Sequence, residues 1–206
     1  MGRPERRRRG SGAQGHRRHE TVGFHKRARS PGSRRRRRCT GDRVAAEAPY
    51  NKGVTKGLKI AIGADERTHL TDAVVDDLRK RGCEVELHGA LGSDDPRWPE
   101  VARVVAERVA SGHAEQGVLF CWTGTGVSMA ANKVPGARAA LCADAETARG
   151  ARKWNDANIL CMSLRLTAPI VAKEILDAWF TAGVDASERD NIERVKAMDS
   201  SKSRAT

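Results

Sequence analysis

The sequence lacks any apolar stretch approaching the roughly 20 residues that a membrane-spanning helix requires. The early arginines are not followed by an apolar segment of about seven residues or more, so we expect no secretory signal. No set of His, Asp and Glu residues has metal-ligand spacing, and neither a metal nor another cofactor is expected. The chain is therefore expected to be cytoplasmic, with no membrane partner.

Paired cysteine motifs are also missing. The chain has five cysteines, an odd number, and none forms a C-x-x-C pair. This pattern favours reduced thiols in a cytoplasm over a disulfide framework or a zinc site. Cys83, Cys142 and Cys161 each lie in or beside a strand-like run, and we expect them to be core residues.

Acidic residues are scarce only in the first quarter of the chain. Residues 1–56 hold 18 of the 38 Lys and Arg residues but only 4 of the 26 Asp and Glu residues. The basic excess therefore belongs to this segment, and the remainder is not expected to bind nucleic acid. Because the segment has few large apolar residues, it cannot bury enough surface to offset its ordering entropy, and we predict a disordered Arg-rich tail over 1–56.

Two interpretations of the tail stay open. Its arginine runs, Arg6 to Arg9 and Arg34 to Arg38, could bind nucleic acid or act as a localisation signal. The alternative is a solvated appendage, or a segment upstream of a true start near Val54 or Gly57. We favour the appendage.

After the tail, short apolar runs alternate with helical periodicity. The runs predict strands over 58–64, 83–88, 117–121, 137–142 and 159–162. Helical spacing predicts helices over about 70–78, 101–109, 125–133, 145–153, 169–180 and 188–198, with a polar loop over 89–99. Regular alternation predicts one three-layer α/β/α domain over 57–206, built on a five-stranded parallel, Rossmann-like sheet.

The most informative stretch is residues 118–133, which predicts a strand, a glycine loop and a helix. The Thr-Gly-Thr-Gly turn that follows Cys121 and Trp122 brings free N–H groups to a helix start, where they can hold an anion. A thiol beside such groups can act as a base while they stabilise an oxyanion, as enolisation requires. The competing interpretation is a buried structural thiol beside an ordinary turn. The loop is not a dinucleotide fingerprint, which would follow the first strand, and it lacks a P-loop lysine.

Ligands of parallel sheets bind beyond the carboxyl ends of the strands. Asp65, Cys121, Asp144 and Ser163 each fall at or just after a predicted strand end. We expect these side chains to gather at one edge of the sheet.

These motifs resemble the ribose-5-phosphate isomerase type B family, which includes the galactose-6-phosphate isomerase subunits. That family carries a Cys-Gly-Thr-Gly-x-Gly-x-Ser-x-Ala-Ala-Asn-Lys run in the place of Cys121 to Lys133. The likeness covers about residues 58–199, and its other matches are Gly63-Ala64-Asp65, Trp154-Asn155-Asp156-Ala157-Asn158, Arg165, Asp177-Ala178-Trp179 and Arg194-Val195.

The resemblance implies an aldose–ketose isomerase that moves a proton between C1 and C2 of a sugar phosphate through a cis-enediolate. It makes Cys121 the base, with Thr123 assisting near the ring oxygen. The substrate-binding residues it implies are Asp65, Glu66, Trp122, Gly124, Thr125, Gly126, Trp154, Asn155, Arg165, Arg189 and Arg194. The three arginines would clamp the phosphate, which a guanidinium fork matches bidentately. It also implies a homodimer or a dimer of dimers with shared sites.

Three positions depart from the family pattern. Glu66 stands where the family has histidine, Trp122 where it has glycine, and Trp154 where it has the histidine thought to open the furanose ring. Indole cannot donate and accept protons as imidazole does. The family default is ribose 5-phosphate, but a tetrose 4-phosphate needs no ring opening because its 4-oxygen carries the phosphate. The alternatives are a non-catalytic sugar-phosphate-binding subunit and nucleic-acid binding through the tail.

Overall fold

The computed structural model describes residues 55–202. The predicted disordered tail lies outside them apart from its last two residues, so that prediction and the domain boundary remain predictions. Within this range a single sheet forms from β1 (Lys59–Ala64), β2 (Glu84–Gly89), β3 (Gln116–Cys121), β4 (Ala139–Leu141) and β5 (Ile159–Ser163). The strand order is β2-β1-β3-β5-β4, and every pairing is parallel. The predicted α/β fold is confirmed.

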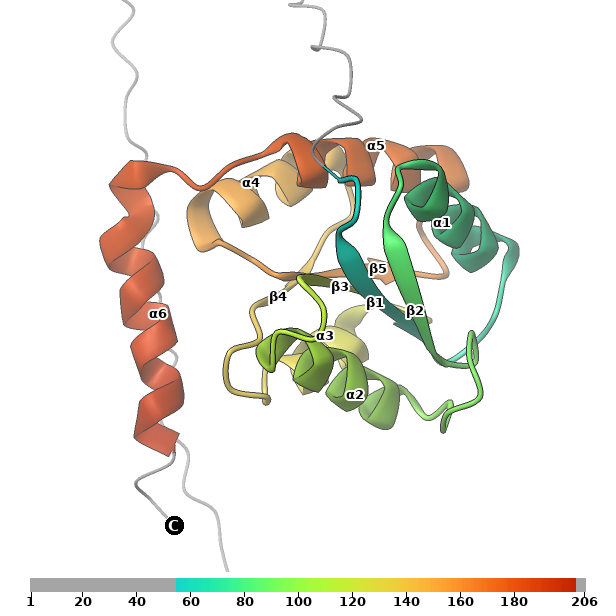
Figure 1. The fold of residues 1–206 in the computed structure, drawn as a ribbon, viewed down its shortest axis with the longest axis horizontal. Coiled ribbons are helices and arrows are strands. Elements are labelled where there is room, and N and C mark those ends of the chain that lie inside the picture. Colours follow the sequence, from blue (N-terminus) through green and yellow to red (C-terminus); the bar gives the residue numbers. More distant parts are fainter. Residues whose placement is uncertain (1–54, 203–206) are drawn as a thin grey trace, which may run out of the picture. The chain divides into compact units, whose positions relative to one another are not determined.

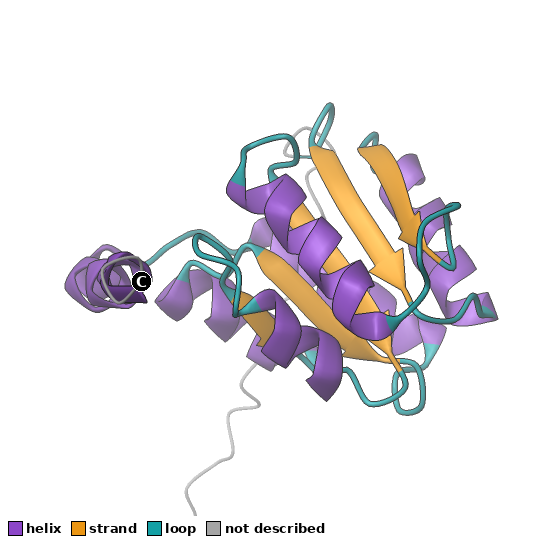
Figure 2. Ribbon diagram, turned by 90° about the horizontal axis from the view of Figure 1, so that it is seen from below, coloured by secondary structure: helices purple, strands orange, loops and turns teal. Residues whose placement is uncertain are grey.

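Helices follow the strands and cover both faces of the sheet. They are α1 (His69–Lys80), α2 (Trp98–Ala110), α3 (Thr125–Ala131), α4 (Ala145–Asn155), α5 (Pro169–Thr181) and α6 (Arg189–Lys202), with a short 3₁₀ helix, η1, at Ala186–Glu188. Figure 1 shows α1, α4 and α5 above the sheet and α2 and α3 below it. Figure 2, turned by 90° and seen from below, shows the strands side by side, with helices in front of them and behind them.

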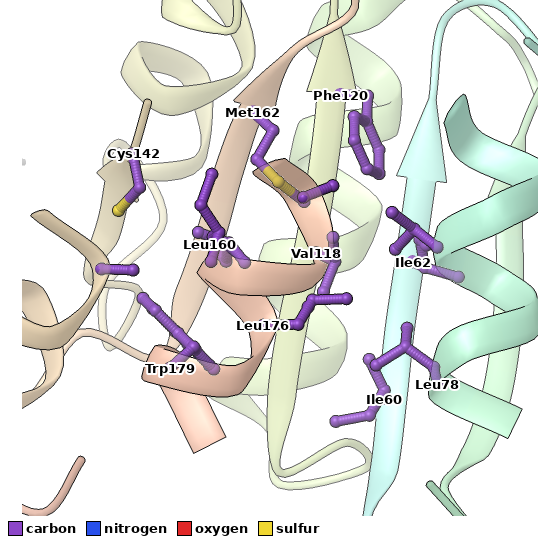
Figure 3. Close-up of a cluster of buried hydrophobic side chains, with 14 of the residues drawn as sticks. Ile60, Ile62, Leu78, Val118, Phe120, Cys142, Leu160, Met162, Leu176 and Trp179 are labelled. Carbon is purple, nitrogen blue, oxygen red and sulfur yellow. The ribbon is translucent and has the colours of Figure 1, made fainter. Parts of the chain in front are cut away.

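Alternating strand residues supply the two halves of the core. One face of the sheet, which includes Ile62, Phe120 and Leu160, packs against α1, α4 and α5, where Trp179 and Leu176 are fully buried (Figure 3). The other face packs against α2 and α3 through a second cluster of buried side chains. A parallel sheet buried on both faces gives the near-continuous apolar strands seen in the sequence.

The predicted elements are confirmed with small changes at their ends. β4 is shorter than predicted, since only Ala139–Leu141 pair with β5. The predicted polar loop over 89–99 ends at Arg97, and Trp98 and Pro99 open α2. Cys83, Cys142 and Cys161 are buried and unpaired, in agreement with their predicted place in the core. None of the helices in the described residues is long and apolar enough to span a bilayer.

Candidate active site

The loop between β3 and α3 places Cys121 at the carboxyl edge of the sheet, the edge at which the parallel strands end. Cys121 is the last residue of β3 and is only 5% exposed. A tight turn follows it, in which the Gly124 N–H donates to the Cys121 carbonyl at 3.1 Å. The thiol is thus fixed between a buried strand and the start of a helix.

Gly124 is required by the geometry of this turn. It adopts a left-handed conformation with φ of 76° as the residue that caps α3. A Cβ there would lie 2.5 Å from Leu141 Cδ1 and 3.0 Å from the Met162 backbone. Glycine therefore allows both the turn and the close approach of the loop to β5.

Several N–H groups of the loop are available to a ligand. Among the described residues, the backbone N–H groups of Thr123, Thr125 and Gly126 have no protein acceptor. The hydroxyls of Thr123 and Thr125 lie 2.7 Å apart and are hydrogen bonded to each other. Unpaired N–H groups at the end of a buried strand are suited to hold an anionic oxygen.

Asp65 follows β1 at the same edge. Its Oδ1 is buried without a hydrogen-bond partner in the described residues. Burial raises the pKa of this carboxyl, and the charge of neighbouring Glu66 adds to the rise. Glu66 itself is exposed. A buried, unpaired carboxylate oxygen can accept a hydrogen bond from a substrate hydroxyl.

Arg165 and Trp122 complete the carboxyl-edge group. The backbone N–H of Arg165 donates to the Trp122 carbonyl at 3.1 Å, which ties the loop after β5 to the loop after β3. The Trp122 side chain is 59% exposed, and the guanidinium of Arg165 has no carboxylate partner in residues 55–202. A guanidinium without a carboxylate partner, on a loop tied to the glycine turn, favours a phosphate.

Asp144 and Ser163 lie at this edge as predicted, but both have structural partners. The Asp144 carboxylate caps α4 by accepting from the Thr147 N–H at 2.7 Å and from its hydroxyl at 2.8 Å, and these bonds lower the pKa of Asp144. The Ser163 hydroxyl donates to the Trp122 carbonyl at 2.9 Å and accepts from the Leu166 N–H at 3.1 Å. They shape the edge, and we assign neither to the chemistry.

The other predicted site residues lie at the opposite, amino edge, where the strands begin. Trp154 and Asn155 end α4, just before β5 starts at Ile159. Arg189 and Arg194 lie on α6, are exposed, and form no ion pair in the described residues. One chain therefore carries two groups of predicted residues that its own fold does not bring together.

Specific contacts hold α6 against this amino edge. The Asp199 carboxylate accepts from the Gly136 N–H at 2.8 Å, and Lys196 lies 3.7 Å from Asp156. A cavity of about 500 Å³ between α6 and the end of α4 is lined in part by Trp154 and Asn155. The predicted site residues at the amino edge thus border a cavity that is separate from the loop at Cys121.

One residue at the carboxyl edge was missed from the sequence. Trp98 opens α2, and its ring packs on Gly126, at the second position of α3. The sequence predicts a polar loop at this position, although a proline in the first turn of a helix, here Pro99, is a helix-start signal. In the described residues no group of three or more His, Cys, Asp and Glu side chains could hold a metal ion.

Comparison with known proteins identifies the family. A family model of ribose/galactose isomerases matches residues 60–198. The chain is 39% identical to D-erythrulose-4-phosphate isomerase of Pectobacterium atrosepticum over 61% of this chain and 84% of that one. It is 37% identical to ribose-5-phosphate isomerase B of Escherichia coli over 68% and 96%. The structure of ribose-5-phosphate isomerase B from Clostridium thermocellum superposes with a TM-score of 0.66 and 36% identity, covering 70% of this chain and 99% of that one. The resemblance seen in the sequence is confirmed, and the chain belongs to the ribose/galactose isomerase family.

Proposed function

We propose that this sugar-phosphate isomerase interconverts an aldose and a ketose phosphate, and that its preferred substrate is a tetrose 4-phosphate. Relatives of similar identity are named for a four-carbon and for a five-carbon substrate, so likeness alone does not choose between them. The observation that carries the choice is Trp154, which stands where the family pattern has the ring-opening histidine.

The proposed chemistry needs only residues at the carboxyl edge for the proton transfer. The Cys121 thiolate takes the proton from the carbon next to the carbonyl, which leaves a cis-enediolate, and returns it to the former carbonyl carbon. The free N–H groups of Thr125 and Gly126 belong to the turn that follows Cys121 and can stabilise the enediolate oxygen. Thr123 assists at the oxygen atoms, and Asp65 accepts a substrate hydroxyl.

The two groups of site residues support a shared site. A substrate held at Cys121 cannot reach Asn155 of the same chain, because the two residues lie at opposite edges of the sheet. We therefore propose at least a homodimer, in which Trp154, Asn155, Arg189 and Arg194 of a second copy complete the site around Cys121. The partner chain would supply the second half of the phosphate clamp.

Ring opening separates the candidate substrates. Ribose 5-phosphate closes to a furanose, and a protein catalyst of opening needs a group that both donates and accepts a proton. The Trp154 indole only donates, and α4 and α6 carry no histidine within the described residues. A tetrose 4-phosphate cannot form a furanose, so it needs no such group.

A non-catalytic subunit is the alternative within the same family. It is disfavoured by the retained thiol, glycine turn and free N–H groups, because a binding protein has no need of a base. Nucleic-acid binding through the tail concerns residues outside the described range. The buried, unpaired thiols of Cys83, Cys121, Cys142 and Cys161 support a reducing compartment such as the cytoplasm.

A substrate panel tests the proposal. Purified full-length protein would be assayed in both directions with four-, five- and six-carbon aldose and ketose phosphates, with Cys121→Ser as the blank. We expect the highest kcat/KM with erythrose 4-phosphate and erythrulose 4-phosphate. A large preference for ribose 5-phosphate would remove the tetrose assignment and leave the isomerase, whereas no turnover of any member would overturn the isomerase itself.

A further inference from the structure

The Trp98 indole lies against the loop that the proposed mechanism uses. A Cβ built on Gly126 would lie 3.2, 3.3 and 3.4 Å from the Cε3, Cδ2 and Cζ3 atoms of Trp98. Nearly equal distances to three adjacent ring atoms mean that the ring meets Gly126 with its face rather than its edge. Because the side chain is 42% exposed, a good part of the ring still faces solvent.

The helix that carries Trp98 is held tightly. Behind Trp98, α2 buries Val101 and Val105 completely or nearly so. It packs so closely on β1 that a Cβ on Gly63 would lie 2.5 Å from Val101 Cγ1. The first residue of α2 therefore has a fixed position over the loop, and its ring forms a rigid wall.

We propose that Trp98 is a specificity-determining residue that limits the length of the sugar chain bound at Cys121; this inference rests on the proposed function. The reacting carbons are held at the thiol and the free N–H groups, so the remaining carbons of the substrate must extend past the outer side of the loop between β3 and α3. Trp98 borders this loop on the side of α2. Its ring face offers no acceptor to a hydroxyl.

The physical effect is selective for chain length. A four-carbon substrate places its phosphate one carbon nearer to the loop and extends less far past its outer side. A pentose must press an additional hydroxymethylene group against indole carbon atoms, where its hydroxyl loses water without gaining a partner. The indole therefore penalises the longer chain more than the shorter one.

The test compares Trp98→Ala and Trp98→Phe with the wild type, using kcat/KM for erythrose 4-phosphate and ribose 5-phosphate. We expect Trp98→Ala to shift the ratio toward ribose 5-phosphate by about tenfold or more, mainly through a lower KM for the pentose. Trp98→Phe keeps an aromatic ring on Gly126 and should shift the ratio less. Met129→Ala removes another exposed apolar side chain, from α3 itself, and should leave the ratio unchanged.

A double-mutant cycle checks the contact independently. Gly126→Ala adds a methyl group under the Trp98 ring, so it should lower kcat/KM in the wild type and cost less in the Trp98→Ala background. Equal effects in both backgrounds, or a parallel fall for both substrates in Trp98→Ala and Trp98→Phe, would overturn the role of Trp98. A wild type inactive on the whole panel would overturn the proposed function and this inference together. An active wild type with an unchanged ratio overturns this inference alone.

Discussion

Cys121 and Asn155 lie at opposite edges of the same sheet. Cys121 ends β3 in register with Ser163, the last residue of β5, whereas Asn155 comes before Ile159, the first residue of β5. The length of β5 separates these two levels, about 13 Å at roughly 3.3 Å per residue. The helix α4 connects the end of β4 to the start of β5, so its last residues, Trp154 and Asn155, lie at the amino edge. No rotation of the Cys121 or Asn155 side chain can therefore bring the two together.

This separation predicts that two damaged chains can repair each other. Cys121→Ser alone should lose turnover by about 10²-fold or more, because a hydroxyl is too weak a base at neutral pH. Asn155→Ala should also be nearly inactive, because Asn155 of the second copy would bind the reacting oxygens of the substrate. In a mixed dimer one site carries both defects and the other carries neither, so random mixing of the two variants should recover about one quarter of wild-type activity.

The measurement is the rate after the two variants are unfolded together and refolded, or co-expressed. Cys83→Ser is the matched control for thiol loss, since Cys83 is a buried cysteine beside β2 and Thr55, remote from the loop. It should keep normal activity. A mixture no more active than its components would contradict the shared site, and an active Cys121→Ser would remove the thiol from the mechanism.

The fold was predictable because its signals are local. Each strand is a short apolar run and each helix has a periodic apolar face, so the order of the elements follows from the sequence. The extent of β4 was not predictable, because its pairing stops at Leu141 opposite Cys161 although β5 continues to Ser163. Trp98 was missed because its partner, Gly126, is distant in sequence and has no side chain to reveal a contact.

The site was only half predictable for a similar reason. Strand ends locate Asp65 and Cys121 at one edge, and the structure places them there. Arg165, which the resemblance named, follows β5 at the same edge. The hydrogen bonds that make Asp144 a helix cap and Ser163 a loop brace depend on neighbouring backbone atoms. Family motifs name Trp154 and Asn155 as site residues, but a motif records proximity in an assembly and does not say which chain supplies each part.

Gly124→Ala should lower the free energy of unfolding by more than the left-handed backbone conformation of Gly124 alone would cost. Gly112 is the matched control, because it has φ of 75° but no neighbour within 4 Å of an added Cβ, whereas Gly124 has φ of 76° and meets Leu141 and Met162. The left-handed conformation costs about 1–2 kcal/mol in either variant. Overpacking should add about 1–3 kcal/mol for Gly124→Ala alone.

Urea unfolding of Gly124→Ala and Gly112→Ala measures the difference in the free energy of unfolding. Only the change at Gly124 should also reduce kcat/KM, because it shifts the loop that holds the N–H groups. Equal losses of stability in the two variants would mean that the loop is not pressed against β5.

Asp65→Asn should raise stability while it lowers activity. Burial raises the pKa of Asp65 in the folded state, so the folded protein binds a proton more readily than the unfolded chain, and stability is lost as pH rises through the folded-state pKa. Asparagine carries no titrating carboxyl, so the variant does not lose this stability as pH rises. The Tm of the variant should therefore exceed that of the wild type at pH 7, and the gap should close as pH falls below about 3.9, the ordinary value for Asp.

Thermal unfolding from pH 3 to 8 checks the sign of this effect, and kcat/KM at pH 7 checks the expected loss of hydroxyl binding. Asp144→Asn is the contrasting variant, because hydrogen bonds from Thr147 lower the pKa of Asp144. Its Tm should fall below that of the wild type at neutral pH. A Tm of Asp65→Asn below the wild type at pH 7 would mean that the carboxylate has a stabilising partner in solution.

The last prediction concerns Trp154, which stands where the family pattern has an imidazole. Its ring packs on its own helix, where a Cβ on Gly150 would lie 2.7 Å from Cζ3, and the side chain is 53% exposed. Trp154→His should therefore leave the fold intact. If the indole is the reason that ring opening is not catalysed, the wild type depends on the small fraction of ribose 5-phosphate that is open, and the variant should not.

We therefore expect Trp154→His to raise kcat/KM for ribose 5-phosphate more than for erythrose 4-phosphate, measured as the ratio of the two in each protein. Trp154→Phe controls for the loss of the indole, since it supplies no proton-transfer group and should leave the ratio near that of the wild type. The competing explanation is that Trp154 only packs between two copies while Glu66 opens the ring. In that case the wild type should already turn over ribose 5-phosphate well, and Trp154→His should not change the ratio of kcat/KM for ribose 5-phosphate to that for erythrose 4-phosphate. Glu66→Gln should lower this ratio, because only the pentose depends on a group that transfers the ring proton.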